Sequence, residues 1–333
     1  MGALKVAYVG GWGRSGSTLL DRMLGQVSGC VSLGEVRQIW QRGCLENASC
    51  GCGTSFKNCD FWTEVGEVAF GGWGNLDVPR AVQLRLSLDR GWSVAFLIAP
   101  RALPAFDRQL AEYGVLLSRL YRGIQRVARA DVIVDSSKLP SHAFILRRLP
   151  ELDLRLIHLV RDSRGVAFSW QKQLVKDPIT GDKLLTYGPK AAALRYNLYN
   201  LQTRLLRSMG VPYLFARYED LVANPEPTLR RIFDHIGSET QPDLSFLSDE
   251  AVNLRLNHTV GGNPMRFRQG PITLRPDDRW KEGLSRSDRR WVTSLTYPLL
   301  LRYGYTGRWR RGAEPAAEAA PATLSGATRG SQG

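Results

Sequence analysis

The chain has 333 residues, of which 43% are hydrophobic and 23% are charged, and this composition excludes a disordered chain and is typical of a globular protein. The formal net charge of +14 favours an anionic partner, a class that includes nucleic acid, acidic lipid and phosphorylated small molecules. The length suffices for one large α/β domain or two smaller ones with a substantial core.

The hydrophobic segments give no sign of export or membrane insertion. Residues 1–6 lack a basic region followed by an apolar run, which a secretory signal would need. The most apolar internal run, from Val94 to Pro100, is far too short to span a bilayer. We therefore predict a cytoplasmic protein without stable membrane insertion.

Short apolar segments alternate with segments of helical spacing along most of the chain. Strands are predicted at Val6–Gly10, Val132–Val134, Leu154–Val160 and Tyr213–Ala216. Helices are predicted between them, at Thr18–Leu24, Leu110–Ala128, Ser141–Leu149, Gly165–Leu174, Ala191–Met209 and Pro227–Ile236. This alternation predicts an α/β fold, in which a mostly parallel sheet is flanked by helices on both faces.

Three segments depart from this alternation. Residues 41–104 contain a Cys-rich loop followed by helical stretches that Gly and Pro interrupt, and they are predicted to form an insertion. Residues 175–190 are predicted to form a mobile loop. From residue 312 to 333 the chain is mostly Ala, Pro, Gly, Ser and Thr, which predicts a disordered tail after a single domain at 1–311.

The segment from Gly10 to Thr18 is a glycine-rich turn between the first predicted strand and the first predicted helix. Such a turn directs backbone N–H groups and the positive end of the helix at one point, which suits a phosphate. The segment is not a Walker A loop, because the residues around Arg14 differ in order and spacing from the Gly-Lys-Ser/Thr pattern of that loop. No nearby Asp offers a magnesium ligand either. A structural turn without a ligand is the alternative interpretation.

A second basic segment follows the predicted strand at Leu154–Val160. Arg161 stands at the end of this strand, and Ser169 lies about two turns into the next predicted helix. Ligands of open α/β sheets bind at the carboxyl ends of the strands, so two such ends predict a ligand with two separated anionic groups. The alternative is a surface ion pair between Arg161 and Asp162.

Together these two segments resemble the cofactor motifs of the sulfotransferase family that uses 3′-phosphoadenosine 5′-phosphosulfate. In that family the first motif binds the 5′-phosphosulfate, and an Arg and a Ser eight positions apart bind the 3′-phosphate. The resemblance implies a P-loop-like sulfotransferase fold. It also implies cofactor binding by Gly13, Arg14, Ser15, Gly16, Ser17, Thr18, Arg161 and Ser169.

Two later segments extend the resemblance as far as about Trp280. Residues 216–225 are similar to the family's Tyr-Glu-Asp-Leu segment, whose Tyr lies against the adenine. This similarity implies that Tyr218 binds the cofactor. Residues 261–268 resemble the basic loop that closes over the cofactor. This similarity implies that Arg266 and Arg268 bind the cofactor.

Other details resemble the tyrosylprotein-type and related bacterial enzymes more than the cytosolic steroid and phenol type. Glu35 matches a Gly-Glu segment whose Glu is the proposed base, and Lys138 matches a Lys-x-Pro segment whose Lys stabilises the transferring group. The resemblance thus implies Arg14, Glu35 and Lys138 as catalytic residues. His142 is the other nearby candidate for the base.

The implied reaction moves a sulfuryl group in line from this donor, a co-substrate, to a hydroxyl group of a small-molecule, carbohydrate, lipid or phenolic acceptor, and no metal is required. One alternative is a nucleotide-dependent small-molecule kinase. Another is a non-enzymatic basic module that binds anions, but nucleic acid is disfavoured because the basic residues concentrate in strand-end motifs. The acceptor and the oligomeric state stay open.

Four cysteines, Cys44, Cys50, Cys52 and Cys59, lie close together in the sequence without a Cys-x-x-Cys pair. We interpret them first as structural thiols, and a zinc site is the alternative. A similar cysteine stretch is frequent in related bacterial sulfotransferases. His158 stands inside an apolar predicted strand and is predicted to be a hydrogen-bonded core residue.

Overall fold

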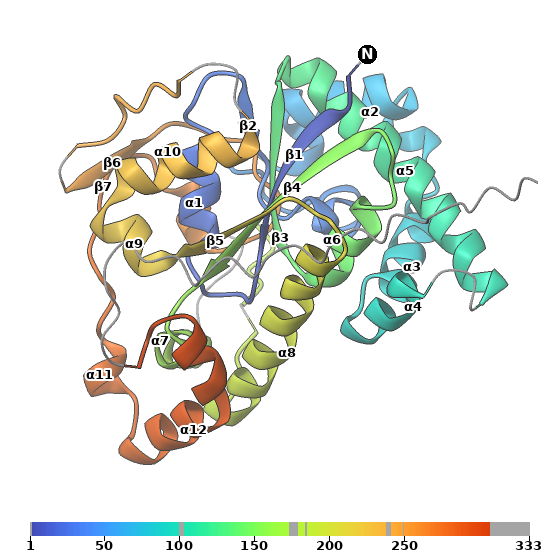
Figure 1. Cartoon of the computed structure of the whole chain (residues 1–333). Coiled ribbons are helices and arrows are strands. Elements are labelled where there is room, and N and C mark those ends of the chain that lie inside the picture. Colours follow the sequence, from blue (N-terminus) through green and yellow to red (C-terminus); the bar gives the residue numbers. More distant parts are fainter. Residues whose placement is uncertain are drawn as a thin grey trace, which may run out of the picture.

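The computed structural model describes residues 2–99, 103–172, 179–183, 185–237, 241–248 and 250–306. Within them, one five-stranded parallel sheet runs in the order β2-β3-β1-β4-β5 (Figure 1). The strands are β1 (Leu4–Gly10), β2 (Cys30–Ser32), β3 (Val132–Lys138), β4 (Leu152–Val160) and β5 (Tyr213–Arg217). The predicted tail at 312–333 and residues 175–178 and 184 of the predicted mobile loop lie outside the described residues.

Helices connect the strands and pack on both faces of the sheet, which confirms the predicted α/β fold. They are α1 (Ser17–Leu24), α2 (Asp60–Phe70), α3 (Val78–Leu88), α4 (Val94–Ile98), α5 (Pro104–Ala128), α6 (Pro140–Leu146), α7 (Ser163–Trp170), α8 (Pro189–Ser208), α9 (Tyr218–Ala223), α10 (Pro225–Ile236), α11 (Trp280–Gly283) and α12 (Arg286–Arg302). Single 3₁₀ turns lie at Val36–Gln38, Phe56–Asn58, Trp73–Asn75, Gly91–Ser93 and Pro264–Phe267, and a seven-residue π-helix lies at Ile39–Leu45.

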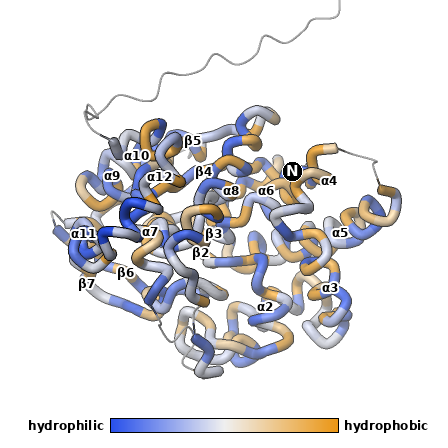
Figure 2. Tube along the Cα trace, turned by 90° about the horizontal axis from the view of Figure 1, so that it is seen from below, coloured by the Kyte–Doolittle hydropathy of each residue, from blue (hydrophilic) through white to orange (hydrophobic). Residues whose placement is uncertain are grey.

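Strand β1 divides the core into two layers. Val6 and Tyr8 pack into a cluster with residues of α2, α3, α5 and α6, whereas Ala7 and Val9 pack into a second cluster with α1 and α10. Because both faces of a central parallel strand are buried, such a strand needs a continuous apolar run. Figure 2 shows α2, α3 and α5 gathered on one side of the molecule and α9, α10, β6 and β7 on the other.

Each of the four predicted strands and six predicted helices is present, with ends displaced by a few residues, and residues 173–174 of the helix predicted at Gly165–Leu174 lie outside the described residues. The sequence analysis did not identify β2, which has only three residues, or the antiparallel pair of β6 (Ala251–Leu254) and β7 (Gly270–Thr273). The predicted insertion at 41–104 contains α2, α3, α4 and the first residue of α5. Among the described residues, none of the helices combines the length and apolar character that crossing a membrane requires.

A buried arginine in α1 fastens this helix to the segment that follows β6. Arg22 has no solvent exposure, and its guanidinium donates hydrogen bonds to the carbonyl oxygens of Arg255, Arg266 and Arg268, at 2.5, 3.0 and 2.8 Å. An uncharged side chain would leave these carbonyl oxygens with one donor fewer in a water-poor environment. Arg22 therefore fixes the position of this segment beside the glycine-rich turn at Gly10–Thr18, which we call the phosphate loop.

We expect the substitution Arg22→Met to lower the free energy of unfolding by about 3 kcal/mol, because several buried acceptors lose a charged donor. Urea unfolding followed by circular dichroism measures the change. The exposed Arg290 is the matched control, since Arg290→Met removes the same group from the surface. Equal stability of the two variants would contradict this role of Arg22.

Candidate functional site

The site lies at the carboxyl edge of the sheet, where the neighbouring strands β3, β1 and β4 end. Lys138 ends β3, the glycine-rich turn follows β1, and Arg161 follows β4. Gly11 N donates to the carbonyl oxygen of Lys138 at 3.3 Å, and Arg161 Nη1 donates to the carbonyl oxygen of Arg14 at 3.4 Å. The sheet therefore brings together the three basic residues that the sequence analysis singled out separately.

Two glycines let the phosphate loop approach aromatic rings closely. A Cβ atom at Gly16, where φ is +89°, would lie 2.3 Å from the Tyr218 ring, and one at Gly13 would lie 2.7 Å from the Trp170 ring. The Arg14 guanidinium carbon sits 5.0 Å from the centre of the Trp170 ring. This cation–π contact turns the Arg14 side chain towards α7 and limits its rotation.

The phosphate loop contains polar atoms whose hydrogen-bonding capacity is not used within the protein. Arg14 Nη2 and Ser15 Oγ are buried, and neither has a hydrogen-bond partner among the described residues. Burial lowers the pKa of Arg14, and the nearby Glu35 carboxylate opposes this effect. Buried donors are normally paired, so these two favour an anionic ligand at the loop.

Glu35 and Lys138 form an ion pair beside the loop. Lys138 Nζ lies 2.7 Å from Glu35 Oε1 and also donates to the Ser136 carbonyl oxygen at 3.1 Å. The Glu35 backbone N–H donates to the Val260 carbonyl oxygen at 2.8 Å, which ties the residue to the segment after β6. The pair thus holds a proton acceptor and a cation at one point.

A buried carboxyl group in α1 supports the turn that leads to Glu35. Asp21 accepts hydrogen bonds from Ser32 Oγ at 2.5 Å and from the Gly34 N–H at 3.3 Å. Burial raises the pKa of Asp21 to about 7, and these hydrogen bonds oppose the increase. The carboxyl group therefore changes its charge near neutral pH, close to the candidate base.

Near Arg161, where the sequence predicts a second anionic group to bind (the second anion site), lie a carboxylate and a lysine that the sequence analysis missed. Arg161 Nη2 lies 3.1 Å from Asp277 Oδ2, and the Arg161 guanidinium carbon lies 4.8 Å from the centre of the Tyr218 ring. Burial lowers the pKa of Lys172, and the positive charges of Arg279, Arg161 and Arg14 lower it further. Asp277 thus offsets part of the charge where several cations gather.

The other predicted cofactor residues differ in their positions. Thr18 Oγ1 accepts the Asn263 N–H at 3.5 Å, Ser17 is buried and Ser169 is half-buried near the end of α7. Arg268 is exposed. Arg266 is buried, and its guanidinium donates to the carbonyl oxygens of Thr259 and Ser49 at 2.7 and 2.8 Å.

For Arg266 the structure shows internal contacts, and the cofactor contact that the resemblance implies stays a prediction. Its guanidinium is hydrogen-bonded inside the protein and joins two loops. The alternation of basic and apolar residues at 264–268 did not reveal which arginine points inwards.

His158 and His142, which the sequence analysis considered, are both fully buried. His158 bonds to the Tyr213 hydroxyl at 2.6 Å and to Asn200 Oδ1 at 2.8 Å, and burial lowers its pKa to about 4. This confirms the prediction of a core histidine. His142 lies between Asp89 and Asp135 without solvent exposure, so an acceptor cannot reach it and Glu35 is the better candidate for the base.

Three of the clustered cysteines meet a histidine from a distant segment. The side-chain ligand atoms of Cys50, Cys52, Cys59 and His258 all lie within 4.8 Å of one another. The interpretation of these cysteines as structural thiols without a metal did not anticipate His258, because it lies about 200 residues further along the chain. Cys44 is not part of this group.

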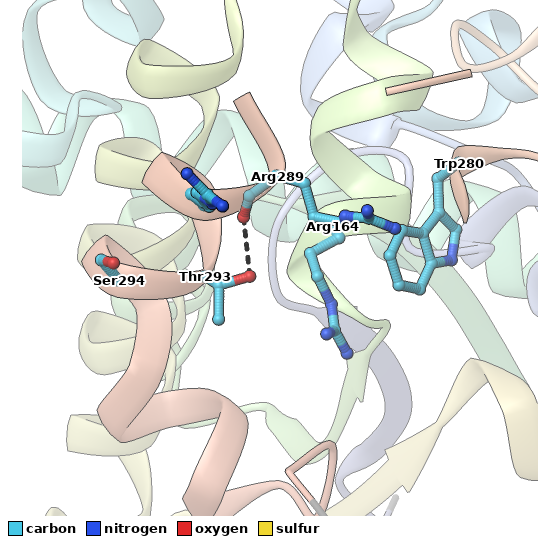
Figure 3. A pocket seen from close by; sticks show the side chains of 6 residues that line it. Arg164, Trp280, Arg289, Thr293 and Ser294 are labelled. Atoms are coloured by element: carbon cyan, nitrogen blue, oxygen red, sulfur yellow. Dashed lines mark hydrogen bonds between the residues drawn. The ribbon is translucent and has the colours of Figure 1, made fainter. Parts of the chain in front are cut away.

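Two surface pockets lie beside the second anion site and not over Glu35. One, of about 370 Å³, is lined by Tyr218, Asp277 and Lys281 among others. The other, of about 460 Å³, lies between α7, α11 and α12, where Arg164 stands next to Trp280 and Thr293 Oγ1 donates to the Arg289 carbonyl oxygen (Figure 3). This second pocket contains none of the predicted site residues. We therefore place the candidate site at the strand ends and not in the pocket.

The known proteins to which the chain is similar are sulfotransferases. Residues 87–242 match the model of a family described as the sulfotransferase family. This range contains Lys138, Arg161, Ser169 and Tyr218, whereas Arg14 and Glu35 precede it.

Two curated relatives are similar over a longer range. Carbohydrate sulfotransferase 2 of Mus musculus and that of Homo sapiens are 25% and 27% identical to the chain in an alignment of 242 residues. The alignment covers 62% of this chain and 42% of each relative. The chain therefore matches less than half the length of these relatives. Among solved structures, the sulfotransferase domain from the curacin biosynthetic pathway is 21% identical, with 89% of this chain and 98% of that chain covered and a TM-score of 0.46.

We expect Asp21 to make stability depend on pH. Because its pKa is raised on folding from 3.8 to about 7, its contribution is fully present below about pH 4 and is lost as the pH rises through about 7. The substitution Asp21→Asn should remove this loss, which amounts to at most about 4 kcal/mol in total and to about 3 kcal/mol between pH 5 and pH 8. Urea unfolding at pH 5 and pH 8 measures it.

The control is Asp60→Asn, which changes an exposed carboxylate in α2. This variant should keep the pH dependence of the wild type. If Asp21→Asn also keeps that dependence, the ionisation assigned to Asp21 is wrong.

Proposed function

Because residues 87–242 match the sulfotransferase family and the curated relatives are sulfotransferases, we propose that the chain transfers a sulfuryl group from 3′-phosphoadenosine 5′-phosphosulfate to a hydroxyl group of an acceptor. The observation that carries the proposal is the contact between the two basic turns, in which Arg161 donates to the Arg14 carbonyl oxygen. A single ligand with two anionic groups can bridge turns that lie so close together. The desulfated donor, 3′,5′-ADP, has this property.

The phosphate loop is suited to the sulfonated end of the donor. The positive charges of Arg14 and Lys138, whose residues meet at the strand ends, can neutralise charge on the sulfuryl oxygens and on the leaving phosphate, and the unpartnered Ser15 Oγ can donate a hydrogen bond there. We assign the hydroxyl groups of Ser17 and Thr18 to the 5′-phosphate. The donor's 3′-phosphate would then lie near Arg161 and Ser169, with Tyr218 between the two ends.

The transfer itself needs one bond to form and one to break. The acceptor oxygen attacks sulfur in line, the bond from sulfur to the 5′-phosphate oxygen breaks, and the acceptor proton passes to Glu35. The leaving phosphate keeps the electron pair of the broken bond. Lys138, at 2.7 Å from Glu35, stands where it can assist both groups.

The acceptor is proposed only as a class. The curated relatives are named carbohydrate sulfotransferases, which supports a sugar hydroxyl as one candidate beside phenolic, lipid and other small-molecule hydroxyl groups. A panel that contains all these classes, incubated with the donor and read by mass spectrometry, identifies the acceptor.

We expect calorimetry to detect binding of 3′,5′-ADP and not of ATP with Mg²⁺, which separates a sulfotransferase from a kinase. Arg161→Ala should weaken the binding of 3′,5′-ADP by at least about tenfold, because a charged contact to the 3′-phosphate is lost. The substitution should leave the affinity for 5′-AMP, which lacks that phosphate, nearly unchanged. The exposed Arg290→Ala is the matched control.

Two outcomes would contradict the proposal. If the folded wild-type chain does not bind 3′,5′-ADP, the donor is wrong. If Arg161→Ala weakens the binding of 5′-AMP as much as the binding of 3′,5′-ADP, the assignment of Arg161 to the 3′-phosphate is wrong. A non-enzymatic anion-binding module would bind the nucleotide without any transfer to the acceptor panel.

We expect Glu35→Gln to retain 3′,5′-ADP affinity and to lower turnover by about 100-fold or more, because the acceptor proton loses its base. The rate of this variant should rise at high pH, where phenolic acceptors ionise without help. Glu46→Gln is the control, since Glu46 pairs with Arg42 away from Lys138. Unchanged turnover in Glu35→Gln would remove Glu35 from the mechanism.

A further inference from the structure

The cysteine–histidine cluster outside the anion site has the composition of a metal centre. Cys50 and Cys52 lie in a loop that ends at Cys59, the residue before α2, and His258 lies in the segment after β6. Cys59 Sγ is 3.2 Å and Cys50 Sγ is 3.7 Å from His258 Nδ1, and Cys52 Sγ is 3.7 Å from Cys59 Sγ. Two distant segments thus direct four ligand atoms at one point.

These separations fit a tetrahedral zinc ion. Zinc bonds of about 2.3 Å to sulfur and about 2.0 Å to nitrogen place tetrahedral ligands about 3.8 Å apart for two sulfurs and about 3.6 Å apart for sulfur and nitrogen. The measured distances of 3.2 to 3.7 Å lie close to these values. The widest spacing in the cluster, at most 4.8 Å, needs to close by only about 1 Å.

Hydrogen bonds within the protein fix the loop that holds Cys50 and Cys52. Cys50 N donates to the Thr54 carbonyl oxygen at 2.8 Å, and Gly53 N donates to the Cys50 carbonyl oxygen at 2.9 Å. Gly51 N donates to the Thr259 carbonyl oxygen at 3.0 Å, and a Cβ atom on Gly51 would lie 1.9 Å from Asn257 Oδ1. Only glycine allows the cysteine loop to pack so closely against the histidine segment.

The histidine is also oriented by its surroundings. The His258 ring stacks on Phe61, with 4.8 Å between ring centres and 16° between planes, and its carbonyl oxygen accepts the Trp62 Nε1–H at 2.9 Å. These contacts present Nδ1 to the sulfur atoms. Supporting contacts of this kind orient metal ligands and tune their affinity.

We propose that Cys50, Cys52, Cys59 and His258 bind one structural zinc ion. Four protein ligands close the coordination shell and leave no position for a substrate, which is typical of a structural and not a catalytic site. Cys50 and Cys59 are buried, with 0% and 2% exposure, whereas Cys52 and His258 are half-buried and give the ion a route of entry. The thiols release their protons as the ion binds.

The ion joins the loop at 48–59 to the segment that supports the candidate base. The carbonyl oxygen of Val260, two residues after His258, accepts the Glu35 N–H, and Val260 also pairs with Gly34. Zinc would therefore stabilise the packing around Glu35 without contacting the reacting atoms. The proposal does not depend on the sulfotransferase reaction, and metal content tests it directly.

The first measurement is the metal content of the wild-type full-length chain. We treat the protein with a chelator and a reductant, add zinc chloride, remove free metal, and count zinc by inductively coupled plasma mass spectrometry. The expected result is about one zinc ion per chain, with three thiols protected from alkylation. A folded chain without bound zinc overturns the proposal, and so does a disulfide among these cysteines that persists with zinc and reductant present.

The second measurement compares variants with cobalt as a spectroscopic probe. In the wild type, Co²⁺ should give the thiolate charge-transfer band and the intense visible bands of tetrahedral coordination. The substitution Cys52→Ser, at the half-buried ligand, should reduce the charge-transfer band and weaken zinc binding at least about tenfold. The matched control is Cys44→Ser, which changes a buried thiol outside the cluster and should keep the wild-type spectrum and affinity.

Octahedral cobalt bands in the wild type, or equal zinc affinity in Cys52→Ser and the wild type, would overturn the assignment of these ligands. If Cys52→Ser does not fold, the wild-type zinc content and cobalt spectrum still decide the question. Binding of 3′,5′-ADP by a zinc-free wild type would leave the proposed function intact, so the two proposals fail separately.

Discussion

Parallel pairing of β3, β1 and β4 is the constraint on which the candidate site depends. Parallel strands end at the same edge of a sheet, so residues that follow neighbouring strands meet there regardless of their separation in the sequence. Lys138, the phosphate loop and Arg161 follow these three strands, and β1 pairs with both of the others. The strand order, and not any direct attraction between the cations, brings the positive charges together.

Gathering cations in this way is unfavourable unless something offsets their repulsion. Within the described residues, Asp277 pairs with Arg161 and Glu35 pairs with Lys138. Aromatic faces take part as well, because Trp170 lies under Arg14 and Tyr218 lies under Arg161. These contacts hold the basic side chains in place while leaving donors of the phosphate loop unpaired, which is the arrangement that an anionic ligand completes.

Much of the fold follows from local sequence, since β1 and β4 are buried on both faces and therefore appear as continuous apolar runs. The phosphate loop and Arg161 were predicted for the same reason, because each directly follows such a run. β2 escaped prediction because three residues are too few to show a periodicity. Its position at the sheet edge is set by pairing with β3, which is a tertiary interaction.

The partners of the site residues were harder to predict. Asp277 is more than 100 residues from Arg161, and nothing in its local sequence distinguishes it from other surface carboxylates. Arg266 and Arg268 stand two positions apart in a basic segment, yet one is buried against carbonyl oxygens and the other is exposed. Only packing decides between such neighbours, because a guanidinium can be buried where enough acceptors surround it.

The segment from Asn257 to Asn263 connects the anion site to the cysteine–histidine cluster. At one end Asn263 N donates to Thr18 Oγ1, in the middle Val260 accepts the Glu35 N–H, and near the other end Thr259 accepts the Gly51 N–H. Arg161 and Tyr218, by contrast, are held by β4 and β5 and do not depend on this segment. A disturbance of the cluster would therefore loosen Glu35 and Thr18 before the contacts around Arg161, because the two halves of the site have different anchors.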